Sequence, residues 1–444
     1  MILGGRTPDL VLAALVTLHA SCATGAGAPR GAAVAADERG PARPLRCDAV
    51  DAGTSLQARI DRAPEGGALC LGPGTYVGPF AIDRGITIWG PRDAVLRSNG
   101  HGTTVSITGD GARLAGVTLD GSGARYDTED AAVKVKQADG VRIEGLRIVR
   151  AVFGILSERT NGIVVRDNEI RGNPDVPHGM RGDAIRLWET RQGLVQGNRV
   201  VDSRDIVVWY SPGNRVLDNH VERGRYGTHF MYSSDNEVAG NEYRSNAVGV
   251  FVMYSRNIHV HGNRLLDADG PSGMGLGLKE SGNVRVHDNL FVHNATALYL
   301  DTSPLTIGDE DVFERNAFRL SDRAVVFHGR ASGNRFKANA FVANGQQVEI
   351  EGGGSALEAT WDGNHYDDYA GYDLDDDGTG DVPYEVRSLA NELTASHPNL
   401  AFFRGTPALS VVEALGSLVP LFEPRTLLRD ERPAMSDPIL EALR

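Results

Sequence analysis

A histidine and three methionines occupy positions where short strands would place them on one face. His229 and Met231 are two residues apart, so they point to the same side if this stretch is a strand. Met253 holds the place of Met231 in the next copy of the same phrase, and Met274 begins the copy after that. An imidazole with two or three thioethers suits Cu(I). We therefore expect a Cu(I) site here; the alternative is an apolar patch for a protein partner, because methionine favours adaptable surfaces.

A second histidine group follows in the chain. His259 and His261 share a face by the same two-residue spacing. His261 and His287 each stand two residues before a repeat asparagine, so they occupy the same position in successive repeats. Three stacked imidazoles can bind Cu(II) or Zn(II). The alternative is a set of polar side chains on a solvated face, so we rank this group second as a metal site.

An acidic run near the C-terminus has the ligand spacing of a calcium loop. Oxygen-bearing side chains recur at alternate positions around a turn-making glycine, and they are Asp373, Asp375, Asp377, Thr379 and Asp381. Hard oxygen ligands at this spacing are typical of an EF-hand-like Ca²⁺ site. Tyr384 stands where such a loop has its bidentate glutamate, so another segment must complete the site. Bound calcium would have a structural role.

These candidate ligands belong to a repeated pattern of short strands. Copies of one phrase run through residues 182–303, and most are followed by a second short strand that ends in asparagine. These asparagines recur every 21 to 26 residues, at Asn198, Asn219, Asn241, Asn263 and Asn289. Such a period, with asparagine and glycine at the turns, is typical of a β-solenoid. We predict an all-β fold, a single right-handed parallel β-helix in which asparagines bond from rung to rung.

Side chains within each copy alternate between two faces. One set is apolar throughout and predicts the core of the coil. The other set must point outwards, and it includes Trp188, Trp209, Met231, Phe251 and Met253. A merely solvated face would carry threonine, serine, lysine and glutamate, so we interpret the outward stripe as a binding surface.

Several phrases resemble those of the NosD family, the periplasmic β-helix proteins of nitrous oxide reductase maturation. They are RGDAIRLW (181–188), SRDIVVWYSPGN (203–214), RYGTHFMYSSDN (225–236), VGVFVMYS (248–255), SGMGLGLKES (272–281) and NHYDDYAGYDLDDDGTGDVPY (364–384). The resemblance covers residues 45–430, and RYGTHFMYS and GMGLGLKES are its most specific motifs.

The resemblance implies an exported, non-catalytic partner of an ABC transporter made of an ATPase and a membrane subunit. It also implies a part in passing copper from a lipoprotein chaperone to nitrous oxide reductase. The chain has no Walker motif, which fits a subunit that relies on a separate ATPase. Copper would be bound transiently, and the resemblance favours copper at the His229 group.

An enzyme of acidic polysaccharides is the alternative function. Many β-helices are lyases or epimerases that use carboxylates and basic groups on an outward face. Asp183, Arg204 and Asp205 lie beside Trp188 and Trp209, whose rings could hold sugars. We expect both aspartates to point inwards at strand starts, where a role in turns is the simpler interpretation.

The N-terminus predicts export. Residues 1–22 read as a signal peptide, with Cys22 in an imperfect lipidation box, and residues 23–45 read as a flexible linker rich in alanine, glycine and proline. In an oxidising compartment such as the periplasm, Cys47 and Cys70 would form a disulfide; the alternative is two buried thiols. A short amphipathic helix near residues 54–63 should close the end of the coil.

The remaining boundaries follow from where the repeat fades. We assign residues 46–345 to the β-helix with its cap, 346–398 to a loop-rich acidic segment, and 399–444 to an apolar, partly helical tail that either caps the coil or docks on the membrane partner. The net charge of −13 argues against a nucleic-acid partner, which would need a basic stripe.

Overall fold

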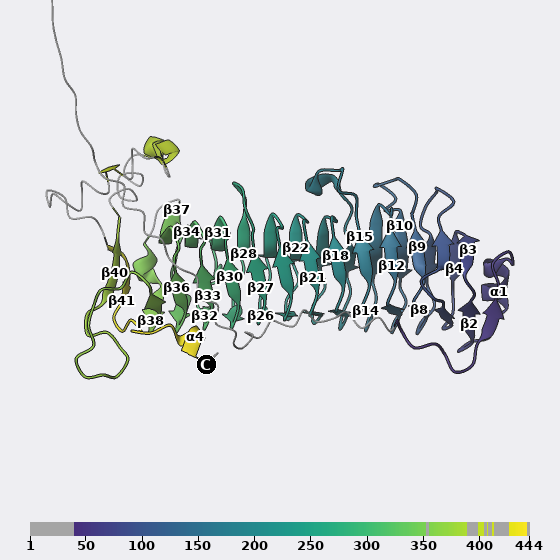
Figure 1. The fold of residues 1–444 in the computed structure, drawn as a ribbon, viewed down its shortest axis with the longest axis horizontal. Coiled ribbons are helices and arrows are strands. Elements are labelled where there is room, and N and C mark those ends of the chain that lie inside the picture. Colours follow the sequence, from purple (N-terminus) through teal and green to yellow (C-terminus); the bar gives the residue numbers. More distant parts are fainter. Residues whose placement is uncertain are drawn as a thin grey trace, which may run out of the picture. The chain divides into compact units, whose positions relative to one another are not determined.

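The computed structural model describes residues 40–351, 355–388, 398–403, 406, 411–412 and 426–441. They form a parallel β-solenoid, as predicted, with strands stacked in three sheets (Figure 1). The first sheet has 14 strands, from β1 (Asp48–Val50) to β38 (Thr360–Asp362); the second has 12, from β4 (Phe80–Ile82) to β37 (Gln346–Glu351); the third has 13, from β3 (Gly74–Val77) to β39 (His365–Tyr366).

The second sheet carries the outward stripe that the sequence singles out. Its strands in this region are β13 (Phe153–Glu158), β16 (Ile185–Trp188), β19 (Asp205–Trp209), β22 (Tyr226–Met231), β25 (Val248–Met253), β28 (Met274–Lys279) and β31 (Thr296–Asp301). Neighbours pair in parallel, and the predicted register is confirmed: Trp188 pairs with Trp209, which pairs with Met231. The same column continues through Met253 to Lys279.

Apolar side chains fill the inside of the coil along its length. Alternate residues of each strand point inwards, as Phe230 does in β22, where it is fully buried in the core. Towards the C-terminal end, phenylalanine rings stack from rung to rung, with centroids 4.8 Å apart for Phe291 and Phe318 and 5.0 Å apart for Phe318 and Phe341. Burying one such ring stabilises the fold by roughly 1.5–3 kcal/mol.

The predicted asparagine ladder is confirmed and runs from Asn168 to Asn364. At each step the side chain joins two rungs. Nδ2 of Asn198 donates to Oδ1 of Asn219 at 2.9 Å and to the carbonyl oxygen of Val165 at 3.0 Å. The backbone N–H of Asn198 donates to the same Oδ1 at 3.0 Å. These bonds satisfy backbone groups that the turn would otherwise leave buried and unpaired.

The helix α1 (Leu56–Arg62) closes the N-terminal end of the coil, as predicted. Its Leu56 and Ile60 are buried against the first rung. The side-chain amide of Gln57 donates to the carbonyl oxygen of Ala81 at 3.1 Å and accepts from the N–H of Ala81 at 2.9 Å. Gln57 therefore takes the place of a neighbouring strand at the exposed edge of β4.

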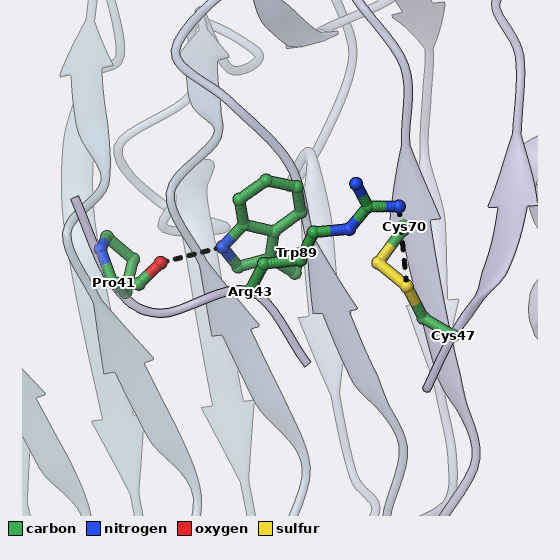
Figure 2. The surroundings of a disulfide bond; sticks show 5 residues. All are labelled: Pro41, Arg43, Cys47, Cys70 and Trp89. Atoms are coloured by element: carbon green, nitrogen blue, oxygen red, sulfur yellow. Dashed lines mark hydrogen bonds between the residues drawn. A yellow bond between two sulfur atoms is a disulfide. The ribbon is translucent and has the colours of Figure 1, made fainter. Parts of the chain in front are cut away.

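A disulfide joins Cys47 to Cys70 beside this cap (Figure 2). The last part of the expected linker is packed rather than free, because Trp89 Nε1 donates to the carbonyl oxygen of Pro41 at 2.8 Å. Pro41 also lies against Gly145, where an added Cβ would be 2.4 Å from the proline Cδ. The expected signal peptide, its Cys22 and residues 23–39 fall outside the described residues.

The coil continues past residue 345, where we expect it to end. Strands β37, β38 and β39 add a further rung, and the asparagine ladder reaches Asn364. Beyond that rung, β40 (Tyr384–Arg387) pairs in antiparallel fashion with β41 (Thr426–Asp430). The carboxylate of Asp430 ends the ladder, accepting from Asn364 N and Nδ2 at 3.0 and 2.9 Å.

Within the tail that we expect to be partly helical, residues 426–430 form a strand. Leu427 and Leu428 lie in the core, so this part of the tail is a cap. A short helix, α4 (Pro438–Glu441), follows. Of the rest of the expected docking tail, the structure describes the 3-10 helix η3 (Pro398–Phe403) and residues 406 and 411–412; the other residues of 389–425 fall outside the described part of the chain. No described helix is long and apolar enough to cross a membrane.

Candidate metal-binding face

The outer face of the second sheet brings Met231 and Met253 together. They are register partners on the adjacent parallel strands β22 and β25. Such strands lie about 4.8 Å apart, so two thioethers start from neighbouring points on the sheet. Both side chains are partly exposed. They are therefore accessible from solvent and close enough to act on one ion.

His229 lies on the same face but is only 4% exposed. Trp209 Nε1 donates to His229 Nδ1 at 3.3 Å, and Asp205 Oδ2 lies 3.8 Å from that nitrogen. His229 Nε2 is buried and has no hydrogen-bond partner among the described residues. A buried polar atom left unpaired costs about 1–3 kcal/mol. The free Nε2 is therefore the atom that a metal ion would satisfy, and the soft donors present fit Cu(I).

Three aromatic rings bury His229. Their centroids lie 4.9 Å (Tyr226), 5.6 Å (Trp209) and 6.5 Å (Phe251) from the imidazole centroid. Trp209 and Phe251 belong to the predicted outward stripe, whereas Tyr226 was not predicted as part of it. Its position at the start of β22 lies before the alternating residues that define the stripe.

Met274 is not in register with the methionine pair. It is the register partner of Val248, at the other end of the strand from Met253. Five residues of strand separate these two positions, which is about 16 Å at the usual rise per residue. The Met274 sulfur instead lies over Gly277, 3.5 Å from where a Cβ would stand, next to the Phe251 ring.

Asp183 and Asp205 form buried ion pairs beside the stripe. Both are almost fully buried. Arg186 Nε and Arg204 Nε donate to Asp183 at 2.7 and 2.8 Å, and Arg225 Nε donates to Asp205 at 3.1 Å. Burial would raise the pKa of Asp205, but His229 and Arg225 lower it below its ordinary value.

The expected inward orientation is wrong for Asp205. It precedes the inward Ile206, so it shares the outer face with Val207 and Trp209, and it lies beside His229. The arginine partners explain how both carboxylates stay buried, since a buried charge must be paired. Sequence reasoning missed this cluster because the partner arginines come from different rungs.

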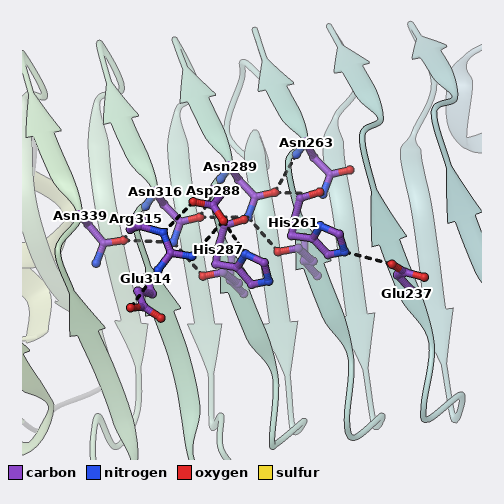
Figure 3. A network of polar contacts seen from close by, with 12 residues as sticks. Glu237, His261, Asn263, His287, Asp288, Asn289, Glu314, Arg315, Asn316 and Asn339 are labelled. Carbon is purple, nitrogen blue, oxygen red and sulfur yellow. Dashed lines mark hydrogen bonds and ion pairs between the residues drawn. The ribbon is translucent and has the colours of Figure 1, made fainter. Parts of the chain in front are cut away.

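The structure brings together two of the three histidines in the second group. His261 and His287 stack with centroids 4.9 Å apart and rings 4° from parallel (Figure 3). His261 Nε2 lies 3.1 Å from Glu237 Oε1, and His287 Nδ1 lies 2.7 Å from Asp288 Oδ2. His259 belongs to the neighbouring column, where its register partner is Arg285 rather than His287. One ring nitrogen of His261 and one of His287 therefore face carboxylates, and His259 lies outside the stacked pair.

The acidic loop gathers three of its five predicted ligands. Oxygens of Asp373, Asp375 and Asp377 lie within 4.8 Å of one another. The charge of Asp377 is the main cause of a raised pKa at Asp375. Asp381 Oδ2 instead accepts from the backbone N–H of Leu374 at 2.7 Å, and Thr379 forms a bridge with Ala434. Calcium binding at this loop stays a prediction.

Comparison with known proteins identifies the family. A probable ABC transporter binding protein NosD of Pseudomonas aeruginosa is 30% identical over 405 residues, which are 86% of this chain and 91% of the relative. The chain belongs to the NosD family. A second NosD protein, from Stutzerimonas stutzeri, is 28% identical over 83% of this chain and 86% of its own length. The family described as "Periplasmic copper-binding protein (NosD)" matches residues 172–371.

Solved structures share the fold of this NosD-family chain. The catalytic unit of a thermostable α-1,3-glucanase from Streptomyces thermodiastaticus superposes with a TM-score of 0.55 at 16% identity, covering 72% of this chain and 70% of that one. At that identity the likeness shows the fold alone. The segment that matches the NosD family contains His229, Met231 and Met253, whereas the acidic loop lies after it.

Proposed function

We propose that this NosD-family chain is a periplasmic, non-catalytic partner of an ABC transporter that takes part in delivering copper to nitrous oxide reductase. The family is described as periplasmic and copper-binding, and relatives are named as probable ABC transporter binding proteins. Its partners would be the membrane subunit and ATPase of the transporter, a copper chaperone lipoprotein and the reductase. Copper is the cargo in this proposal, held for a short time as Cu(I).

The Cu(I) site would consist of His229, Met231 and Met253. The observation that carries it is the unpaired, buried Nε2 of His229 on the face where the two methionines are register partners. Thioether and imidazole ligands select Cu(I) over the harder divalent ions. Two or three ligands with one exposed side suit an ion that must be passed on, because an incoming ligand can attack from solvent.

The surroundings of His229 determine which nitrogen is the ligand. For Nε2 to bind copper, the ring proton must be on Nδ1, where a nearby carboxylate favours it. Asp205 is that carboxylate, at 3.8 Å from Nδ1. Trp209, which donates to Nδ1, would then release this bond. Asp205 therefore acts through His229 as a positioning residue.

The polysaccharide enzyme is the weaker proposal. Its two carboxylates, Asp183 and Asp205, are buried and held by arginines. Glycoside cleavage needs a pair of carboxylates that reach the sugar from both sides. Trp188 and Trp209 contact each other edge to face at 5.7 Å, which is how neighbouring rungs of this stripe pack.

Replacing both methionines tests the copper site. Met231→Leu with Met253→Leu conserves volume and apolarity, so the coil should fold while Cu(I) affinity falls by at least about tenfold, equivalent to about 1.4 kcal/mol. Competition with a chromophoric Cu(I) chelator measures the affinity. Met180→Leu is the matched control, because Met180 is 69% exposed in the loop between β15 and β16 and is not part of β22 or β25.

The double variant also separates the site from the pathway. Unchanged Cu(I) affinity in the folded double variant would show that this face does not bind copper. The face would then be interpreted as a docking surface. A second outcome is that the double variant binds Cu(I) more weakly while nitrous oxide reductase in cells is still fully loaded with copper. That outcome would support the copper site but contradict its role in maturation.

A further inference from the structure

Three arginines surround one carboxylate on the outer face of the first sheet, far from the methionine stripe. They come from the adjacent strands β8 (Arg113–Ala115), β11 (Arg142–Glu144) and β14 (Val164–Arg166). Arg113 and Arg142 are register partners in one column, and Glu144 and Arg166 are register partners in the next. The four side chains therefore meet at fixed points on three successive rungs.

Glu144 is the centre of this cluster and is only 2% exposed. Its carboxylate accepts from Arg113 Nε and from Arg142 Nη2, each at 2.7 Å, and Arg166 Nε lies at 2.9 Å. Burial alone would raise the pKa of Glu144, but the hydrogen bonds from Arg113 and Arg142 bring it below its ordinary value. The carboxylate is thus ionised and neutralises one of the three guanidinium charges.

The arginines keep donors that nothing in the described part of the chain accepts. Each guanidinium has five N–H groups in a rigid fork. Arg113 donates to Glu144 only through Nε, and Arg166 Nε lies close to Glu144 without forming a hydrogen bond, so the Nη groups of both have no acceptor among the described residues. Arg142 and Arg166 side chains are each 42% exposed and that of Arg113 is 21% exposed. Glu144 neutralises one of the three guanidinium charges, and the exposed Asp167 carboxylate lies 3.9 Å from Arg166 Nε, so a net positive charge still faces solvent in a protein whose net charge is −13.

We propose that Arg113, Arg142 and Arg166 form a binding site for a phosphate-type oxyanion. Planar guanidinium forks match phosphate oxygens in bidentate fashion, and their attachment to a β-sheet reduces the flexibility lost on binding. Glu144 is a positioning residue in this site. It orients the three forks from beneath and is too deeply buried to face the anion.

Phosphate in this compartment has two sources, free phosphate and phospholipid headgroups. Pro41 packs against Gly145, the residue after Glu144, so the described chain begins next to the arginine cluster. Lipidation at Cys22 would attach the protein to a membrane through this end of the chain, which makes phospholipid headgroups one source of phosphate. The shared chemistry is the phosphate group, and the experiment distinguishes its sources.

The test uses the exported chain without lipid and two probes. Inorganic phosphate is titrated at constant ionic strength while the thermal midpoint is followed, because a ligand that binds the folded state raises it. Vesicles of phosphatidylglycerol, with phosphatidylcholine for comparison, are then used in co-sedimentation. The variant is Arg142→Gln with Arg166→Gln, which leaves the Arg113–Glu144 pair intact, and the control is the exposed Arg285→Gln.

We expect phosphate to stabilise the wild type and the control, and the double variant to bind it about tenfold or more weakly. Binding to phosphatidylglycerol vesicles without any response to phosphate assigns the site to headgroups; the reverse assigns it to the free anion. No response to either probe, or equal responses in wild type and double variant, overturns the proposal. If the double variant does not fold, Arg142→Lys serves, since it keeps the charge and loses the fork, and undiminished binding there is equally decisive.

Discussion

Asp311 occupies a place in the coil that asparagine fills in other rungs. Its Oδ1 accepts from the backbone N–H of Val284 at 2.8 Å, just as Asn214 Oδ1 accepts from Gly193 N at 2.7 Å. Its Oδ2 takes the place of the amide group and is buried without a hydrogen-bond partner in the described chain. Burial raises the pKa of Asp311 to about 7. This residue is therefore a neutral substitute for asparagine only at acidic pH.

The raised pKa predicts a pH-dependent effect of Asp311→Asn. The stabilising contribution of the protonated carboxyl is fully present below its unfolded pKa of 3.8 and is lost as the pH rises through about 7. Each pKa unit is worth about 1.4 kcal/mol. We expect the substitution to increase the free energy of unfolding by on the order of 4 kcal/mol at pH 8, and by much less at pH 4.

Urea unfolding at both pH values measures the effect, because taking the difference between wild type and variant cancels other titrating groups. The exposed Asp235→Asn is the control. A gain from Asp311→Asn that is the same at pH 4 and pH 8 would show that the carboxyl does not titrate in this range.

The candidate site could be predicted from residue types only in part. The two-residue spacing of His229 and Met231 was enough to place both on the outer face, since strand geometry fixes which side chains share a side. The burial of His229 could not be predicted, because it depends on Tyr226 and on rings from the rungs before and after it. Met274 was predicted from its residue type, which suits copper. Its register partner is Val248 rather than Met253, and the sequence spacing alone did not reveal this.

The acidic loop is the element where a bound ion would change the structure most. Its carboxylates repel one another, as the pKa of Asp375, raised mainly by Asp377, indicates. The loop is also joined to the C-terminal cap, since Met435 N donates to Gly378 O at 3.0 Å and Gly380 N to Pro433 O at 2.8 Å. An ion that holds the carboxylates together would therefore stabilise the end of the coil.

We predict that a calcium chelator lowers the thermal midpoint of the wild type and leaves that of Asp375→Ala unchanged. Binding of an ion to the folded state alone stabilises it by mass action, so the wild-type shift should grow with free calcium. Differential scanning fluorimetry over a calcium series is sufficient. Asp269→Ala, an exposed aspartate elsewhere, should respond as the wild type does. Identical shifts of the thermal midpoint in wild type and Asp375→Ala would show that the loop does not bind the ion.

Strands were predictable where the period was regular, and less so at the C-terminal end. Asn364 continues the ladder and marks a rung beyond residue 345, but the acidic run after it breaks the pattern that identifies a repeat. The strand at 426–430 is a short apolar run, which periodicity alone cannot distinguish from a buried helix. Its pairing with β40, over 40 residues earlier in the chain, decides its conformation.

At the scale of the whole molecule, stability depends on closing both ends of the coil. Asp430 closes the C-terminal end: besides Asn364, its carboxylate accepts from the backbone N–H of Gly363 at 3.3 Å and of Arg432 at 3.1 Å. The side chain is fully buried. Removing it would leave several buried donors unpaired at once.

We predict that Asp430→Ala lowers the free energy of unfolding by roughly 2–4 kcal/mol, because each orphaned buried donor costs about 1–3 kcal/mol. Glu431→Ala, at the exposed neighbouring position, should cost little. Urea unfolding gives the magnitude, and amide hydrogen exchange should show that protection is lost first in the rungs nearest β39. Uniform loss along the coil would mean that the end rung does not unfold separately.

The asparagine ladder has a consequence for how this chain can change in length. Each rung satisfies its backbone through the next, so the number of rungs changes only by whole repeats, whereas the loops within a repeat vary, as ladder steps of 21 and 30 residues show. The distance between the arginine site and the methionine pair is therefore quantised in steps of about 4.8 Å. A shorter or longer homologous coil would present the two proposed sites at a different separation, so the number of repeats would set the distance between whatever binds at each.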